Sequence, residues 1–164
     1  MICRGFITPV FFIYFCTIMN FSQQEFESLI STHTGVIAYK PLADEVDYEN
    51  STFPIKLHEN KKLLQSSKIE NPFVWAEKYI EYFKKDKIYI LVPGTKFDIY
   101  GTRYGRGGGW YDRFLSKVPR AWLRIGVTDI SRLSSERLEK KPWDQIMDFV
   151  IVREDNSWNI YKTI

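Results

Sequence analysis

The sequence predicts an α/β protein built on a mainly parallel sheet with helices on both faces. Short apolar runs rich in β-branched and aromatic residues, such as 35–39, 87–92 and 122–127, are typical of buried strands. Segments with helical spacing and helix-start signals alternate with these runs, which favours parallel strand–helix–strand units. The length of 164 residues fits one domain, and a hydrophobic content of 45% is sufficient for a core.

The first 20 residues are an apolar tract that we separate from the predicted domain at 21–164. Arg4 precedes an apolar run from Pro9 to Met19. This run is too short to span a bilayer, and the small-residue cleavage site of a signal peptide is missing, so we expect no stable membrane insertion and a cytoplasmic protein. A mitochondrial or signal-bearing form, a start nearer Met19 and an unusual buried segment remain open alternatives.

The first predicted helix follows this tract. Ser22 and Glu25 have the spacing of a capping box, and Phe21 with Phe26 fits the hydrophobic staple around it. The polar stretch 50–70 is predicted mainly as loop.

A second helix is predicted to begin at Asn71 and Pro72, which are a favourable cap and first helical position. It leads into the strand at 87–92. Residues at helical spacing define its predicted apolar face: Phe73, Ala76, Ile80 and Phe83.

A glycine-rich segment follows the strand at 87–92, which Pro93 and Gly94 close with a turn. Residues 95–105 are predicted as a connection. Three consecutive glycines, 107–109, then precede a helix that Pro119 ends. The spacing of four apolar residues predicts this helix: Trp110, Tyr111, Phe114 and Leu115.

The C-terminal part is predicted to complete the sheet. A strand is expected at 122–127, and the charged stretch 131–140 is interpreted as a candidate helix. Asn156 and Ser157 then turn the chain into a short strand at 158–161.

Charge is distributed unevenly along the chain. The net charge is only +3, but residues 21–60 contain seven acids and two bases, whereas residues 103–137 contain eight bases and three acids. We therefore expect an anionic ligand to bind the second half. RNA binding is a weaker alternative because no aromatic stacking pattern accompanies the bases, and we expect no nucleic-acid partner. Cys3 and Cys16 both lie in the N-terminal tract, so no disulfide framework or zinc site is implied.

The glycine triplet and its neighbours predict a phosphate site. Glycines let backbone N–H groups turn toward an anion, and the first turn of a helix presents unpaired N–H groups. Arg103 and Arg106 can add charge-assisted hydrogen bonds, and Asp112 can hold a cation beside the phosphates. The alternative interpretation is a flexible connector with solvated arginines.

The segment VPGTKFDIYGTRYGRGGGWYDRFL, residues 92–115, resembles the signature of 5-formyltetrahydrofolate cyclo-ligases, also called 5,10-methenyltetrahydrofolate synthetases. Tyr104 and Trp110 depart from the usual leucine and tyrosine, but both keep a bulky apolar body. The resemblance covers roughly 35–155 and implies a Rossmann-like single domain of the cyclo-ligase type. The matching positions are Val92, Pro93, Gly94, Phe97, Asp98, Gly101, Arg103, Gly105, Gly107, Gly109, Tyr111, Asp112 and Leu115.

The resemblance implies ATP-dependent conversion of 5-formyltetrahydrofolate to 5,10-methenyltetrahydrofolate, with ATP as co-substrate and Mg²⁺ as cofactor. It implies that Arg106 is the catalytic residue and that Asp112 and Asp144 bind the metal. The implied substrate-binding residues are Lys40, Glu45, Arg106 and Trp110. The implied ATP-binding residues are Arg103, Tyr104, Gly105, Arg106, Gly107, Gly108, Gly109, Trp110 and Tyr111.

The N-terminal part departs from the family and motivates a second hypothesis. Family members open with a helix that carries a lysine and an arginine for ATP, whereas here only Arg4 precedes Ser22 and no lysine precedes Lys40. The alternative is therefore a catalytically impaired, cyclo-ligase-like protein that binds nucleotide or folate without efficient turnover. On local grounds, Glu45 also fits a solvated loop acid and Asp144 a helix or strand cap. We expect a monomer.

Overall fold

The computed structural model describes residues 21–49, 52–57, 60–64, 70–84 and 86–163. The N-terminal tract, with Arg4, Cys3 and Cys16, lies outside these residues. None of the helices within the described ranges is long and apolar enough to cross a membrane.

A six-stranded sheet occupies the centre of the described chain, in the order β2-β1-β3-β6-β8-β9. The first five strands in this order are parallel, and β9 pairs antiparallel with β8. The prediction of an α/β protein with a mainly parallel sheet is confirmed. The strands are β1 (Gly35–Tyr39), β2 (Lys61–Leu64), β3 (Ile88–Pro93), β6 (Leu123–Asp129), β8 (Phe149–Glu154) and β9 (Ser157–Lys162).

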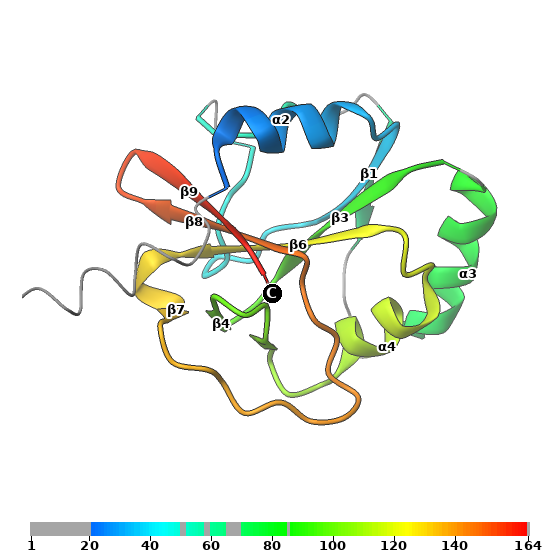
Figure 1. The fold of residues 1–164 in the computed structure, drawn as a ribbon. Coiled ribbons are helices and arrows are strands. Elements are labelled where there is room, and N and C mark those ends of the chain that lie inside the picture. Colours follow the sequence, from blue (N-terminus) through cyan, green and yellow to red (C-terminus); the bar gives the residue numbers. More distant parts are fainter. Residues whose placement is uncertain (1–20, 50–51, 58–59, 65–69, 85, 164) are drawn as a thin grey trace, which may run out of the picture.

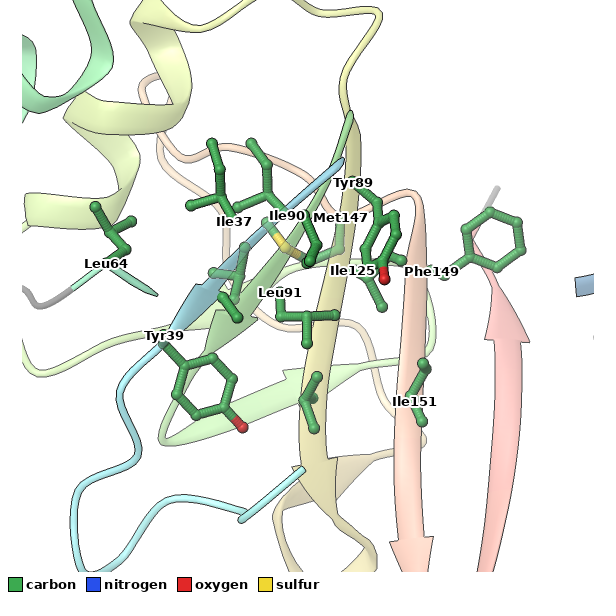
Figure 2. Packing of buried hydrophobic residues seen from close by; sticks show 14 of the residues in the cluster. Ile37, Tyr39, Leu64, Tyr89, Ile90, Leu91, Ile125, Met147, Phe149 and Ile151 are labelled. Carbon is green, nitrogen blue, oxygen red and sulfur yellow. The ribbon is translucent and has the colours of Figure 1, made fainter. Parts of the chain in front are cut away.

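Helices cover both faces of this sheet. Helix α2 (Gln23–Ser31) lies on one face, and α3 (Pro72–Phe83) and α4 (Trp110–Lys117) pack together on the other (Figure 1). Every residue of β1 and β3 is buried, as expected for parallel strands covered on both sides. Figure 2 shows core side chains carried by β1, β3 and β8, among them Ile37, Tyr39, Leu91 and Ile151.

The caps of α2 and α3 are as predicted. Ser22 and Glu25 form the capping box, each side chain accepting a hydrogen bond from the other's backbone N–H at 3.2 Å. The Asn71 side chain accepts a hydrogen bond from the Phe73 N–H at 2.9 Å. Both helix starts therefore follow from local sequence.

The prediction of which residues form the buried face of α3 is partly wrong. Ala76 and Phe83 are buried as expected, but Phe73 is exposed and Tyr79 takes the buried position between them. The Tyr79 ring lies edge-on against Phe114 of α4, with a centroid distance of 6.4 Å. Tyr79 therefore belongs to the face of α3 that packs against α4, which the helical spacing alone did not reveal.

Two sets of strands were not predicted. Strand β2 lies in the stretch predicted as loop, and residues 95–105 form a hairpin instead of a plain connection. The hairpin strands β4 (Lys96–Asp98) and β5 (Arg103–Tyr104) join β7 (Leu133–Ser134) in a second, three-stranded sheet. Strands of two or three residues carry too little periodicity to be predicted from sequence.

The prediction of a helix at 131–140 is wrong. The chain forms a short 3₁₀ turn, η1 (Ile130–Arg132), then β7, and continues without regular structure. Leu133 pairs with Phe97 of β4, and the Leu138 N–H donates to the Asp98 carboxylate at 2.8 Å. Pairing with the hairpin replaces the helix.

Asp98 joins the hairpin to the segment that precedes β8. Its side chain is fully buried, and it accepts backbone N–H bonds from Tyr100 at 3.0 Å, Thr102 at 2.7 Å and Leu138 at 2.8 Å. One carboxylate thus fixes both the turn of the hairpin and the start of the segment 138–147.

The hairpin packs on the main sheet through Phe97. A Cβ atom at Gly126 of β6 would lie 2.4 Å from the Phe97 ring, closer than van der Waals contact allows. Glycine at 126 therefore lets the buried ring lie directly against the β6 backbone.

Candidate functional site

An open cavity of about 780 Å³ lies where the connections after β1 and β3 diverge. The chain passes from β1 to β2 on one side and from β3 to β6 on the other, so this is the topological switch point of the sheet. Parallel α/β sheets bind ligands there, outside the carboxyl ends of the strands. Its lining comes from the segments after β1 and β3, Glu70 before α3, the residues 103–113 and the segment before β8.

The glycine loop forms one wall of the cavity. Gly107 and Gly109 have φ angles of 82° and 58°, which glycine adopts most easily. Gly109 is the N-cap of α4 and supplies no side-chain cap, so backbone N–H groups at this end are left for another acceptor. A Cβ atom at Gly107 or Gly108 would meet no atom within 4 Å, so the loop borders open space. This geometry suits an anionic group.

Arg103 lines the cavity from a buried position. Its Nη2 donates to Asp112 Oδ2 at 2.9 Å, and its Nη1 donates to the Pro93 carbonyl at 3.3 Å. The Arg103 side chain is only 3% exposed, and its Nε has no hydrogen-bond partner within the described chain. The guanidinium also lies 5.5 Å from the Tyr111 ring centroid. The residue is therefore held firmly, and its charge is already opposed by Asp112.

Arg106 is half exposed and reaches across to the segment after β1. Its Nη2 bonds Asp44, and its Nε lies 3.8 Å from Glu45 Oε1. The hydrogen bond from Arg106 holds the pKa of Asp44 below its ordinary value. Arg132 of η1 approaches the same carboxylate, with its Nη2 3.9 Å from Asp44 Oδ2. The structure thus places the predicted residues Glu45 and Arg106 side by side.

The two predicted metal-binding aspartates both line the cavity. Asp112 is engaged at both oxygens, because Oδ1 accepts the Gln145 N–H at 3.2 Å and Oδ2 pairs with Arg103. Asp144 Oδ2 accepts the Lys141 N–H at 2.8 Å. Within the described ranges, no group of three or more histidine, cysteine or acidic side chains is close enough to form a metal cage.

The aromatic residues differ in their exposure. Trp110 is largely buried, stacks on Phe114 at 5.7 Å between centroids, and donates its indole N–H to the Glu70 carbonyl at 2.9 Å. Burial, followed by the negative charge of Glu45, raises the pKa of the Tyr111 hydroxyl, so that it stays protonated. Tyr104 lines the cavity and is 37% exposed. Trp110 and Tyr111 thus belong to the core as well as to the cavity wall.

Lys40, predicted to bind substrate, is exposed directly after β1 and is not among the residues that line the cavity. Conversely, several lining residues were not predicted. Arg113 follows Asp112, one of the two predicted metal ligands, and Lys141 and Trp143 precede Asp144, the other. Trp143 is 64% exposed, an unusual state for tryptophan. Its place beside Asp144 was the available sequence signal.

Comparison with known proteins gives a consistent family. The sequence model of the 5-formyltetrahydrofolate cyclo-ligase family matches residues 44–153. The chain is 25% identical over 118 residues to the 5-formyltetrahydrofolate cyclo-ligase of Mycoplasma pneumoniae, covering 71% of each chain. The range matched by the family model contains the hairpin, the glycine loop and the segment before β8.

Two solved structures share the fold. A 5,10-methenyltetrahydrofolate synthetase from Mycoplasma pneumoniae aligns with a TM-score of 0.50 and 16% identity, over 78% of this chain and 80% of that one. The corresponding synthetase from Aquifex aeolicus aligns with a TM-score of 0.51 and 23% identity, over 87% and 85%. At these identities the likeness concerns the fold.

Proposed function

The chain belongs to the 5-formyltetrahydrofolate cyclo-ligase family, and from this premise we propose that it converts 5-formyltetrahydrofolate to 5,10-methenyltetrahydrofolate with ATP, releasing ADP and phosphate. The observation that carries the proposal is the position of the family signature. Its glycine loop, Arg106 and Asp112 meet Glu45 and Asp144 at one cavity. The cavity lies at the switch point of the sheet and has the size of a small-molecule site.

ATP would bind along the segment 103–111. Backbone N–H groups of Gly107, Gly108 and Gly109 would bind the phosphates, and the buried Arg103 would add positive charge from behind. Tyr104, Trp110 and Tyr111 would supply the apolar wall.

The folate substrate would occupy the side of the cavity nearer β1. Glu45 lines this side, and its Oε2 is fixed by the Leu42 N–H at 3.0 Å, so its carboxylate is preoriented. Trp110 would contact the substrate from the other wall, and Lys40 would have to approach from outside the cavity.

Arg106 would be the catalytic residue. In the proposed reaction the formyl oxygen attacks the γ-phosphate and displaces ADP. The N10 nitrogen then attacks the activated formyl carbon, phosphate leaves with the former formyl oxygen, and N10 gives up its proton. Arg106 stands on the exposed loop between the two substrate regions, so it can exchange Asp44 and Glu45 for the transferring phosphoryl group. Positioning and charge neutralisation of this kind account for most catalysis of phosphoryl transfer.

Mg²⁺ fits this site as a companion of ATP and not as a resident ion. Magnesium is commonly held by one or two carboxylates together with substrate phosphates and waters. Asp112 and Asp144 line the same cavity and could supply those carboxylates. The ion would neutralise phosphate charge.

The test is turnover by the full chain. We expect product to form only with Mg-ATP, detected by the near-ultraviolet absorbance of the methenyl compound. The rate should be below about 10 per second, the median for enzymes, because residues 21–39 offer no lysine or arginine for the phosphates. Omission of ATP is the control.

Two results would contradict the cyclo-ligase proposal. If the chain bound both ATP and 5-formyltetrahydrofolate but made no product, the alternative of a binding protein without turnover would be correct. If it bound neither ligand, both functions would be refuted.

A further inference from the structure

Four cationic side chains line the cavity in the described part of the chain: Arg103, Arg106, Arg113 and Lys141. Two of them already have carboxylate partners, since Arg103 pairs with Asp112 and Arg106 with Asp44. Neither Arg113 nor Lys141 forms an ion pair with any described residue. An anion entering the cavity would therefore displace no carboxylate to reach these two side chains.

Arg113 is the better placed of the two for a group bound at the glycine loop. It lies on the first turn of α4, and helical side chains lean toward the N-terminus of their helix. The guanidinium accordingly reaches back to the loop, where its Nη1 lies 3.3 Å from the position that a Cβ atom of Gly109 would occupy. An exposed arginine thus stands directly beside the last glycine of the loop.

The absence of a side chain at Gly109 has a second consequence here. A Cβ atom at 3.3 Å is tighter than most real contacts, so another residue at 109 would shift the guanidinium by a few tenths of an ångström. Glycine at this position therefore serves both the left-handed backbone, with φ 58°, and the approach of Arg113.

We propose that Arg113 is a further phosphate-binding residue of this site, contacting the nucleotide held by the glycine loop. The inference rests on the proposed function, because it takes ATP as the ligand. Arg113 would act at the open side of the loop. Its guanidinium is exposed and has no carboxylate partner in the described chain, whereas the guanidinium of Arg103 is buried and paired with Asp112. A planar guanidinium can bind two phosphate oxygens at once.

Binding of ATP to the full chain tests the proposal. Arg113→Gln removes the charge, Arg113→Lys retains it, and Lys117→Gln is the matched control. Lys117 lies one turn further along α4, 3.4 Å from Glu77, and does not line the cavity. Titration calorimetry with Mg-ATP and, separately, with 5-formyltetrahydrofolate measures both ligands, and thermal unfolding reports on the fold.

We expect Arg113→Gln to weaken ATP binding about tenfold, since an exposed charge-assisted contact is at the lower end of its usual range. Folate affinity and thermal stability should not change, Arg113→Lys should recover part of the loss, and Lys117→Gln should bind like wild type. Equal ATP affinity in Arg113→Gln and Lys117→Gln, with wild type binding ATP, would overturn this inference alone. An equal loss for both ligands would also overturn it. No ATP binding by wild type would overturn the inference together with the proposed function.

Discussion

Replacement of Asp98 by asparagine should destabilise the fold and loosen one wall of the cavity. The carboxylate accepts three backbone N–H bonds in a fully buried position. An amide offers one oxygen, so its NH₂ group would face at least one of these donors. The buried donor left unpaired costs about 1–3 kcal/mol, and each remaining bond loses about 1 kcal/mol with its charged acceptor. Relief from burying a charge offsets part of the sum, and we expect a net loss of about 3 kcal/mol.

Urea unfolding measures this loss. With slopes of about 1–3 kcal/mol/M for small proteins, the midpoint should fall by about 1–3 M. Asp47→Asn is the control, because the exposed Asp47 makes one comparable bond, to the Glu49 N–H at 2.8 Å. That change should stay within about 0.5 kcal/mol. If Asp98→Asn and Asp47→Asn unfolded at the same urea concentration, the assigned role of Asp98 would be wrong.

Hydrogen exchange locates the effect. The Leu138 amide should exchange faster in Asp98→Asn, because it is the donor that anchors the segment carrying Asp144 to the hairpin. The same variant should bind Mg-ATP more weakly. Unchanged protection of Leu138 would mean that other contacts hold this segment.

Three further predictions concern the site and its support. Arg106→Ala should weaken Mg-ATP binding by about 1.5–3 kcal/mol in calorimetry, and an affinity equal to wild type would remove Arg106 from the site. Asp112→Asn and Asp144→Asn should each raise the Mg²⁺ concentration needed for ATP binding, and an unchanged requirement in both would leave them only their hydrogen bonds to backbone. Gly126→Ala should destabilise the protein by about 1–3 kcal/mol in urea unfolding, since its Cβ would meet the Phe97 ring at 2.4 Å, and Phe97→Leu in the same chain should recover part of the loss.

The parts of the fold that the sequence predicted are those with local causes. Ser22 and Asn71 cap their helices through residues two or three positions away, and β1 and β3 are continuous apolar runs. The parts of the fold that were predicted wrongly depend on contacts with residues far away in the sequence. The segment after Arg132 has a helical composition, but β7 pairs with β4, more than 30 residues earlier in the chain.

The candidate site divides in the same way. The signature predicted the glycine loop, Arg106 and Asp112, and the structure brings them to one cavity with Glu45 and Asp144. The signature could not reveal that Arg106 forms an ion pair with Asp44, or that the Arg113 guanidinium lies beside Gly109. Both contacts depend on side-chain directions in the folded chain. Trp143 lies beside the predicted residue Asp144 in the sequence, but only the structure shows that its ring is exposed and lines the cavity.

Among the described strands, β2 forms one edge of the main sheet, and edge strands present backbone groups that can pair with another chain. Its first two residues are Lys61, which pairs with Glu49, and Lys62, which lies 4.1 Å from the Tyr82 ring centroid. These lysines gave β2 the appearance of a loop in the sequence. They also place positive charge where a second copy would have to approach, and like charges would oppose its alignment. The feature that concealed the strand is therefore one that natural proteins use against edge-to-edge aggregation.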